Sequence, residues 1–195
     1  MELLKQRIRR QGRALPGGVI QVDAFLNHQI DPMLADAVAE EFVRRFQGER
    51  ISKVLTVEAS GIAFGILVAL RLRAPLVFAK KRQGSNQGGA ERYTAAVRSY
   101  TKGGVNTIGV SREYLSAADR VLVIDDFMAM GEAAEGLCSL VSQAGAELAG
   151  VGVVIEKGFQ PGGDRLRARG IRVEALARIL SIGPEGHIRF DGEED

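Results

Sequence analysis

The chain is poor in the residues that form disulfides, zinc sites and membrane spans. Its 195 residues include one cysteine and two histidines, which excludes an intrachain disulfide and a multi-cysteine zinc site. That cysteine, Cys138, lies in an apolar pattern, so we expect a buried side chain rather than a catalytic thiol. The charged first residues lack the apolar core of a signal peptide, and the longest apolar run, residues 62–70, is far shorter than a membrane span. We therefore expect a cytoplasmic protein.

An excess of either charge is also missing. The 26 Lys and Arg residues nearly balance the 24 Asp and Glu residues, for a formal net charge of +2. The most basic stretch, residues 5–13, is typical of a solvated helix face, so we expect no nucleic-acid partner. Hydrophobic residues make up 46% and charged residues 26%, as in ordinary globular proteins. The length predicts a single domain over residues 1–195.

What the chain does contain is an alternation of apolar runs with helical patterns. The apolar runs predict buried strands at 53–58, 75–80, 120–126 and 147–157. Helices are predicted at 62–72 and 133–144, and Asp31-Pro32 opens a further helix. Its expected apolar stripe consists of Met33, Leu34, Ala37, Val38, Phe42 and Phe46. Strands that are apolar on both faces and alternate with helices predict an α/β fold, a mostly parallel central sheet flanked by helices.

Some segments interrupt this alternation. Residues 1–30 precede the first predicted strand and are typical of an accessory piece packed over one end. Residues 82–92 form a polar, glycine-rich loop, which is either a plain connection or a mobile lid, and an alternating run follows at 92–100. A hairpin is predicted around residues 184–186.

The most informative segment is residues 120–137. An apolar strand delivers Asp125 and Asp126 at its C-terminal end, and a short loop with Ala129 and Gly131 leads into a helix. In a parallel sheet, ligands bind beyond this end of the strands. Small residues and the N–H groups at a helix start suit a phosphate, and carboxylates accept hydrogen bonds from sugar hydroxyls. A ribose 5-phosphate satisfies both halves, although a metal site or an exposed acidic strand end remains an alternative.

This segment resembles the motif with which type I phosphoribosyltransferases bind phosphoribosyl pyrophosphate (PRPP). The resemblance implies that Asp125 and Asp126 are catalytic residues that hold the ribose hydroxyls. It also implies that the 5-phosphate is wrapped by Ala129, Met130, Gly131, Glu132 and Ala133. Met130 departs from the pattern, because such enzymes commonly carry Thr or Asn there, so a side-chain contact to phosphate is lost.

The wider chain resembles the bacterial xanthine phosphoribosyltransferases. The matching stretches are VDAFLNHQIDP (22–32), SGIAFG (60–65), VFAKK (77–81), VLVIDDF (121–127), QAGAELAGVGVVIEKGFQPG (143–162) and RVEALARILS (172–181). The resemblance implies a type I fold with a small hood over residues 1–30 and a mobile lid at 82–92. It further implies a homodimer that transfers phosphoribosyl from PRPP to xanthine in purine salvage. Mg²⁺ would arrive with PRPP rather than sit in a dedicated protein site.

The same resemblance implies further site residues. Ile20, Asn27 and Lys157 fall at positions that contact xanthine, and Phe127 either stacks on the purine or fills the core. A Lys donor and an amide suit xanthine, which carries a carbonyl at C2 and partial negative charge. The positions implied for pyrophosphate are Ala59, Ser60, Lys80 and Lys81.

Simpler interpretations of these residues stay open on the sequence alone. Asn27 is also typical of a turn before a helix, and Lys157 of a solvated strand end. The rival functions are transfer to adenine, guanine or hypoxanthine, and a PRPP-sensing regulator without catalysis. An RNA-binding attenuator of similar fold is a further rival, but it would need a basic surface that the charge balance does not indicate.

Overall fold

A computed structural model describes residues 1–81, 91–98, 104–183 and 186–193. Its main feature is an eight-stranded sheet with the order β10-β9-β8-β7-β3-β4-β6-β5. The central strands run parallel: β3 (Lys53–Val57), β4 (Leu76–Lys81), β7 (Arg120–Met128), β8 (Glu147–Lys157) and β9 (Val173–Ile182). Antiparallel strands complete the edges: β5 (Arg92–Arg98), β6 (Val105–Ser111) and β10 (Ile188–Phe190). The predicted α/β fold with a mostly parallel sheet is confirmed.

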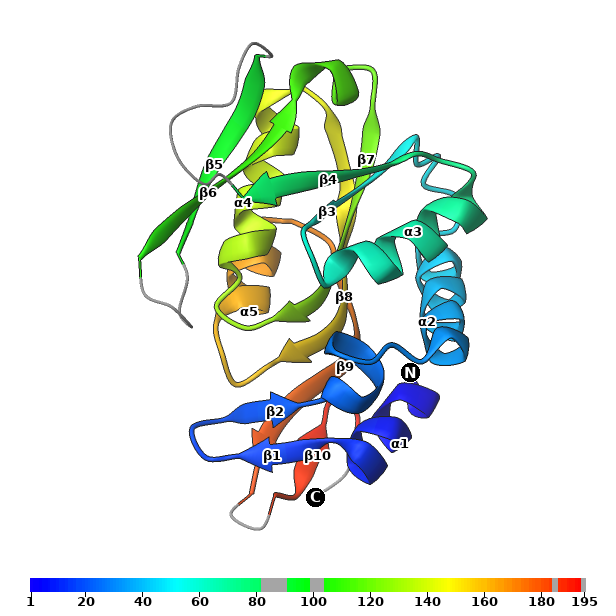
Figure 1. The fold of residues 1–195 in the computed structure, drawn as a ribbon, viewed down its shortest axis with the longest axis vertical. Coiled ribbons are helices and arrows are strands. Elements are labelled where there is room, and N and C mark those ends of the chain that lie inside the picture. Colours follow the sequence, from blue (N-terminus) through cyan, green and yellow to red (C-terminus); the bar gives the residue numbers. More distant parts are fainter. Residues whose placement is uncertain (82–90, 99–103, 184–185, 194–195) are drawn as a thin grey trace.

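Helices cover both faces of this sheet (Figure 1). Their bounds are α1 (Glu2–Gln11), α2 (Pro32–Arg45), α3 (Gly61–Leu72), α4 (Glu132–Gln143) and α5 (Gly162–Ala168). Strand alternation explains the two layers, since successive side chains point to opposite faces. On β7, Leu122 and Ile124 pack in one buried cluster with residues of α2 and α3. Val121 and Val123 pack in the other with residues of α4 and α5.

Helix α2 begins where the sequence predicts. The Asp31 carboxylate accepts hydrogen bonds from the backbone N–H groups of Met33 and Leu34 at 3.0 and 3.2 Å, a typical N-cap. The predicted stripe is wrong at Met33, which is 75% exposed. The buried face is formed instead by Leu34, Ala35, Val38, Ala39 and Phe42, and this helical spacing turns Met33 toward solvent.

The first 30 residues lie beside β9 and β10 at one end of the sheet (Figure 1). After α1 they form a hairpin of β1 (Arg13–Leu15) and β2 (Val19–Gln21), then a π-helix (Asp23–Asn27). The Met1 ammonium donates to the Leu176 carbonyl at 2.5 Å, and Lys5 Nζ donates to the Asp191 carbonyl at 2.9 Å. These bonds tie the N-terminal segment to the strands near the C-terminus. The predicted C-terminal hairpin is confirmed by the antiparallel pairing of β9 with β10.

The predicted loop 82–92 falls largely outside the described residues. Residues 82–90 are not described, and Arg92 already begins β5, so the connection ends before that residue. A short 3-10 helix (Arg112–Tyr114) follows β6. Among the helices of the described residues, none is long and apolar enough to cross a membrane.

Candidate active site

The predicted acidic pair lies at the C-terminal end of β7. Residues 121–124 are fully buried, and they carry Asp125 and Asp126 into a nearly closed environment, where their exposures are 4% and 8%. The Asp126 N–H donates to Asp125 Oδ1 at 3.0 Å. Burial, and then the neighbouring Asp126 carboxylate, raise the pKa of Asp125 well above its ordinary value, while Lys81 opposes this shift. Within the described residues neither carboxylate forms an ion pair, so no basic side chain there competes with a ligand for them.

A tight turn joins this strand to α4. Gly131 has a φ of 84°, a conformation that only glycine adopts without strain, and the helix begins at Glu132, one residue before its predicted start. Among the described residues, no side chain caps the α4 N-terminus. Its first backbone N–H groups are therefore available to an anion, and the helix dipole favours negative charge there.

The turn lines a cavity of about 570 Å³. Residues 127–134 form one wall, and Lys157 and Gln160 contribute from the end of β8 and the loop that follows it. Gly17 and Val19 of the β1–β2 hairpin and Arg98 of β5 complete the lining. The cavity therefore brings every predicted 5-phosphate residue together with Phe127 and Lys157, two of the residues predicted to contact xanthine.

The turn between β3 and α3 lies beside the acidic pair. Strands β3 and β7 are parallel neighbours, so their C-terminal ends share one edge of the sheet. A Cβ placed on Gly61 would clash with Thr56 Oγ1 and lie 3.3 Å from Asp125 Oδ1. The backbone at Ala59 and Ser60, which precedes Gly61, is thus held close to the carboxylates. The Lys81 N–H donates to Glu58 Oε1 at 2.7 Å, which joins the end of β4 to this turn.

Comparison with known proteins agrees with this geometry. The model of the phosphoribosyl transferase domain matches residues 21–169. The chain belongs to the phosphoribosyltransferase family. The xanthine phosphoribosyltransferase of Moorella thermoacetica is 56% identical over 97% of this chain and 96% of that protein. The corresponding protein of Bacillus thuringiensis is 50% identical over 97% and 95% of the two chains.

Solved structures show the same type I phosphoribosyltransferase fold. An adenine phosphoribosyltransferase from Rhodothermus marinus has a TM-score of 0.73 and 25% identity, covering 90% of this chain and 98% of that one. An enzyme of the same description from Giardia lamblia, bound to 9-deazaadenine, has a TM-score of 0.73 at 20% identity, covering 89% and 96% of the two chains. The latter likeness shows the fold alone.

Lys157 is the cation that this phosphoribosyltransferase places in the cavity from β8. It ends the strand and is half-buried, and burial lowers the pKa of its ammonium group. In the ranges that the structure describes, Lys157 makes no ion pair. A partly desolvated ammonium without a carboxylate favours a ligand that carries negative charge or a carbonyl oxygen.

The other predicted base contacts do not line this cavity. Ile20 is 6% exposed and packs in the core cluster, whereas its neighbour Val19 is 47% exposed and lines the cavity. Strand alternation in β2 explains the difference. Asn27 is the last residue of the π-helix and is exposed.

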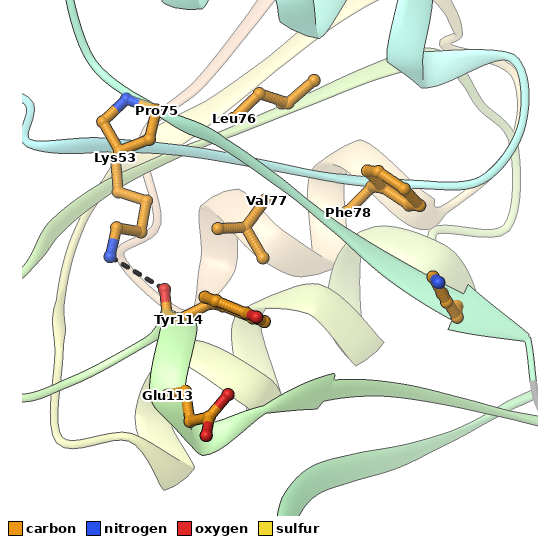
Figure 2. A pocket seen from close by; sticks show the side chains of 8 residues that line it. Lys53, Pro75, Leu76, Val77, Phe78, Glu113 and Tyr114 are labelled. Carbon is orange, nitrogen blue, oxygen red and sulfur yellow. Dashed lines mark hydrogen bonds between the residues drawn. The ribbon is translucent and has the colours of Figure 1, made fainter. Parts of the chain in front are cut away.

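The predicted lysine pair is divided between two places. Lys80 lines a second cavity of about 420 Å³ along the edge of β4, and its Nζ lies 5.7 Å from the centroid of the Phe78 ring. Figure 2 shows this cavity, with Phe78 and Tyr114 among its walls and Lys53 Nζ donating to the Tyr114 carbonyl at 2.8 Å. Lys81 lies instead near the acidic pair, where its charge lowers the pKa of Asp125. Adjacent strand residues point to opposite sides, which explains why the pair divides.

Sequence reasoning missed several cavity residues. Gln160 has a buried Oε1 without a hydrogen-bond partner in the described residues, and Gly17, Val19 and Arg98 come from segments far away in the chain. Gln160 alone had a usable signal, since it is a polar residue in the loop after the strand at 147–157.

Sequence reasoning also missed the buried Glu156. This carboxylate is 0% exposed and accepts hydrogen bonds from Arg167 at 2.7 and 2.6 Å and from Arg178 Nε at 3.1 Å. Arg178 also donates to Asp164 at 2.8 Å. The network fastens the end of β8 to α5 and β9, next to Lys157.

Proposed function

We propose that this chain is a xanthine phosphoribosyltransferase, which converts PRPP and xanthine into xanthosine 5'-monophosphate and pyrophosphate in purine salvage. The observation that carries the proposal is the shared cavity. In the described part of the chain, a helix start without a side-chain cap and a lysine without an ion pair, Lys157, line the same space. The relatives described as xanthine phosphoribosyltransferases, 50% and 56% identical over nearly the whole chain, support the choice of base.

The reaction forms a bond between a purine nitrogen and C1 of the ribose. The bond from C1 to pyrophosphate breaks, its electron pair leaves with pyrophosphate, and the purine nitrogen loses its proton. Positive charge builds on the sugar, so Asp125 and Asp126 would orient the hydroxyls and offset that charge. Lys157 would stabilise the xanthine anion, so that more of the base would have lost its ring proton and could attack C1. Lys81 and the Ala59–Ser60 backbone would bind the leaving pyrophosphate. The predicted contact of Lys80 with pyrophosphate stays a prediction, because Lys80 lines the second cavity.

The site residues fit a Mg²⁺ ion that arrives with the substrate. The described residues contain no cluster of three or more His, Cys, Asp or Glu that could hold a metal. Mg²⁺ prefers carboxylate and phosphate oxygens and needs few protein ligands, and Asp125 and Asp126 offer such oxygens. When bound, the ion offsets negative charge on the leaving pyrophosphate.

The test is incubation with PRPP, Mg²⁺ and each of xanthine, guanine, hypoxanthine and adenine, with the nucleotides separated by chromatography. Xanthosine 5'-monophosphate should form fastest. A higher rate with another base would assign that specificity instead. PRPP binding without any nucleotide product would indicate a regulator.

We further propose a single phosphoribosyltransferase domain that forms a homodimer in the cytoplasm, with residues 1–30 as its hood. The exposed apolar residues Ile66 and Leu70, 52% and 69% exposed on one face of α3, support an interface between copies. Light scattering on the wild type and on Leu70→Glu tests it, because a monomeric wild type would contradict the homodimer.

The mobile lid at 82–92 also stays a prediction. If the lid closes over bound substrate, PRPP and Mg²⁺ should protect this segment from protease cleavage.

A further inference from the structure

The turn that carries the predicted 5-phosphate contacts rests against residues 160–165. The Gly162 N–H donates to the Ala129 carbonyl at 3.2 Å. The Arg165 guanidinium donates to the Met130 carbonyl and pairs with Glu135, in the first turn of α4, at 3.2 Å. Two consecutive carbonyls of the turn are therefore fixed toward the start of α5.

The direction of these carbonyls sets the direction of the following amides. In a trans peptide, the C=O and the next N–H point in opposite directions, and the cis bond in the described residues is Glu58–Ala59. The Met130 N–H consequently points away from Gly162, and the Gly131 N–H points away from the Arg165 guanidinium. Neither amide has a hydrogen-bond partner in the described residues, and both residues line the cavity. These two N–H groups are donors for a phosphate.

The contact between the two segments leaves no room for a side chain. A Cβ placed on Gly162 would lie 2.5 Å from the Ala129 oxygen and 2.5 Å from the Gly131 nitrogen. A Cβ placed on Gly131 would lie 2.8 Å from the Gly162 Cα. Any larger residue at Gly162 would push the turn away from α5 and rotate its amides.

We propose that Gly162 and Arg165 are positioning residues for phosphate binding. They hold the Ala129 and Met130 carbonyls, so that the N–H groups of Met130 and Gly131 face the 5-phosphate of PRPP. This role rests on the proposed function. The two backbone N–H groups would replace the phosphate contact that a Thr or Asn side chain makes at this position and that Met130 cannot make. Arg165 also offsets the charge of Glu135, which would otherwise repel a phosphate dianion.

The first test compares Arg165→Met with Arg169→Met, an exposed arginine just beyond the same helix. Titration calorimetry measures the Kd of ribose 5-phosphate, and turnover assays give KM for PRPP and for xanthine. We expect Arg165→Met to raise the Kd and the KM for PRPP roughly three- to tenfold. The KM for xanthine and the Tm should match the Arg169→Met control. Arg165→Lys should recover part of the loss, because an ammonium group still donates and still neutralises Glu135.

The second test compares Gly162→Ala with Gly183→Ala, where a new Cβ meets its nearest atoms at 3.6 Å. Gly162→Ala should weaken ribose 5-phosphate binding roughly tenfold or more, and the control should not. If Gly162→Ala does not fold, the Arg165 variants decide alone. Wild-type affinity for ribose 5-phosphate in folded Arg165→Met protein overturns the positioning role. The titration needs no catalysis, so a wild type that binds ribose 5-phosphate but makes no nucleotide overturns only the proposed function.

Discussion

Neighbouring strands of the sheet carry buried carboxylates that differ in their partners. Glu156, on β8, is 0% exposed and accepts hydrogen bonds from Arg167 and Arg178. Asp125 and Asp126, on β7, are also buried, yet in the described residues they have no ion pair. A buried charge is tolerated when it is paired, and an unpaired one shifts its pKa or awaits a ligand. From this difference we infer that Glu156 stabilises the fold, whereas Asp125 and Asp126 bind a ligand.

The two groups are connected through α5. Strand β8 pairs Glu156 with Met128 of β7, at the start of the phosphate turn. Glu156 fixes α5 through Arg167, and Arg165 on α5 contacts the turn. The paired carboxylate therefore supports the geometry that the unpaired carboxylates need.

Removing the paired carboxylate should have the largest effect. Glu156→Ala leaves Arg167 and Arg178 facing a buried space without their anion, so the free energy of unfolding should fall by about 3 kcal/mol. Urea denaturation measures it. The control is Glu147→Ala, an exposed acid at the opposite end of β8, for which we expect about 0–1 kcal/mol. Equal losses of unfolding free energy in the two variants would show that the buried Glu156 stabilises the fold no more than an exposed acid does.

Lys157 extends the comparison to cations, because Arg167 and Arg178 have a carboxylate and Lys157 has none among the described residues. Lys157→Ala should lower kcat/KM for xanthine more than for guanine or hypoxanthine, since xanthine combines a C2 carbonyl with easy loss of a ring proton. A polar partner left unpaired costs about 1–3 kcal/mol, which is roughly five- to a hundredfold. Steady-state kinetics with the three bases measures the ratio. Equal losses for all bases would make Lys157 a general scaffold residue.

The substitution Asp126→Asn tests whether the carboxylates without an ion pair contribute to turnover. Turnover should fall at least roughly tenfold, about 1.4 kcal/mol of transition-state stabilisation, with little change in the free energy of unfolding. Asp36→Asn, on the surface of α2, is the matched control and should keep wild-type turnover. A folded Asp126→Asn protein with near wild-type turnover would remove Asp126 from the reaction.

Local features of the site could be predicted from the sequence, because they lie in one continuous segment. The apolar strand, Asp125 and Asp126, the turn and the start of α4 follow one another within residues 120–132. Their chemistry needs only their order in the chain. Four of the five parallel strands, at 53–58, 75–80, 120–126 and 147–157, were predictable for the same reason, since each has its own run of apolar residues.

Features that depend on distant segments could not be predicted. The partners of Glu156 lie 11 and 22 residues further along the chain, and periodicity does not indicate which arginines meet it. Met33 was misplaced because adjacent apolar positions in a helix compete for the buried face. Lys80 and Lys81 look equivalent in the sequence, and only the pairing of β4 decides which one reaches Asp125.

Asp125→Asn should have the smallest effect of the series and an unusual sign. Burial and the Asp126 carboxylate raise the pKa of Asp125 in the folded chain, so the folded state binds more protons than the unfolded state between pH 3.8 and the raised pKa. Stability therefore falls as pH rises through that window, and it stays reduced above it. Asparagine cannot ionise, so the variant should match the wild type near pH 4 and exceed it at pH 8 by roughly 0.5–2 kcal/mol, while it loses turnover. Urea denaturation of both proteins from pH 4 to pH 8 measures this difference. A variant that is less stable than the wild type at pH 8 would mean that the ionised pair is compensated in the folded protein, and the contrast with Glu156 would then disappear.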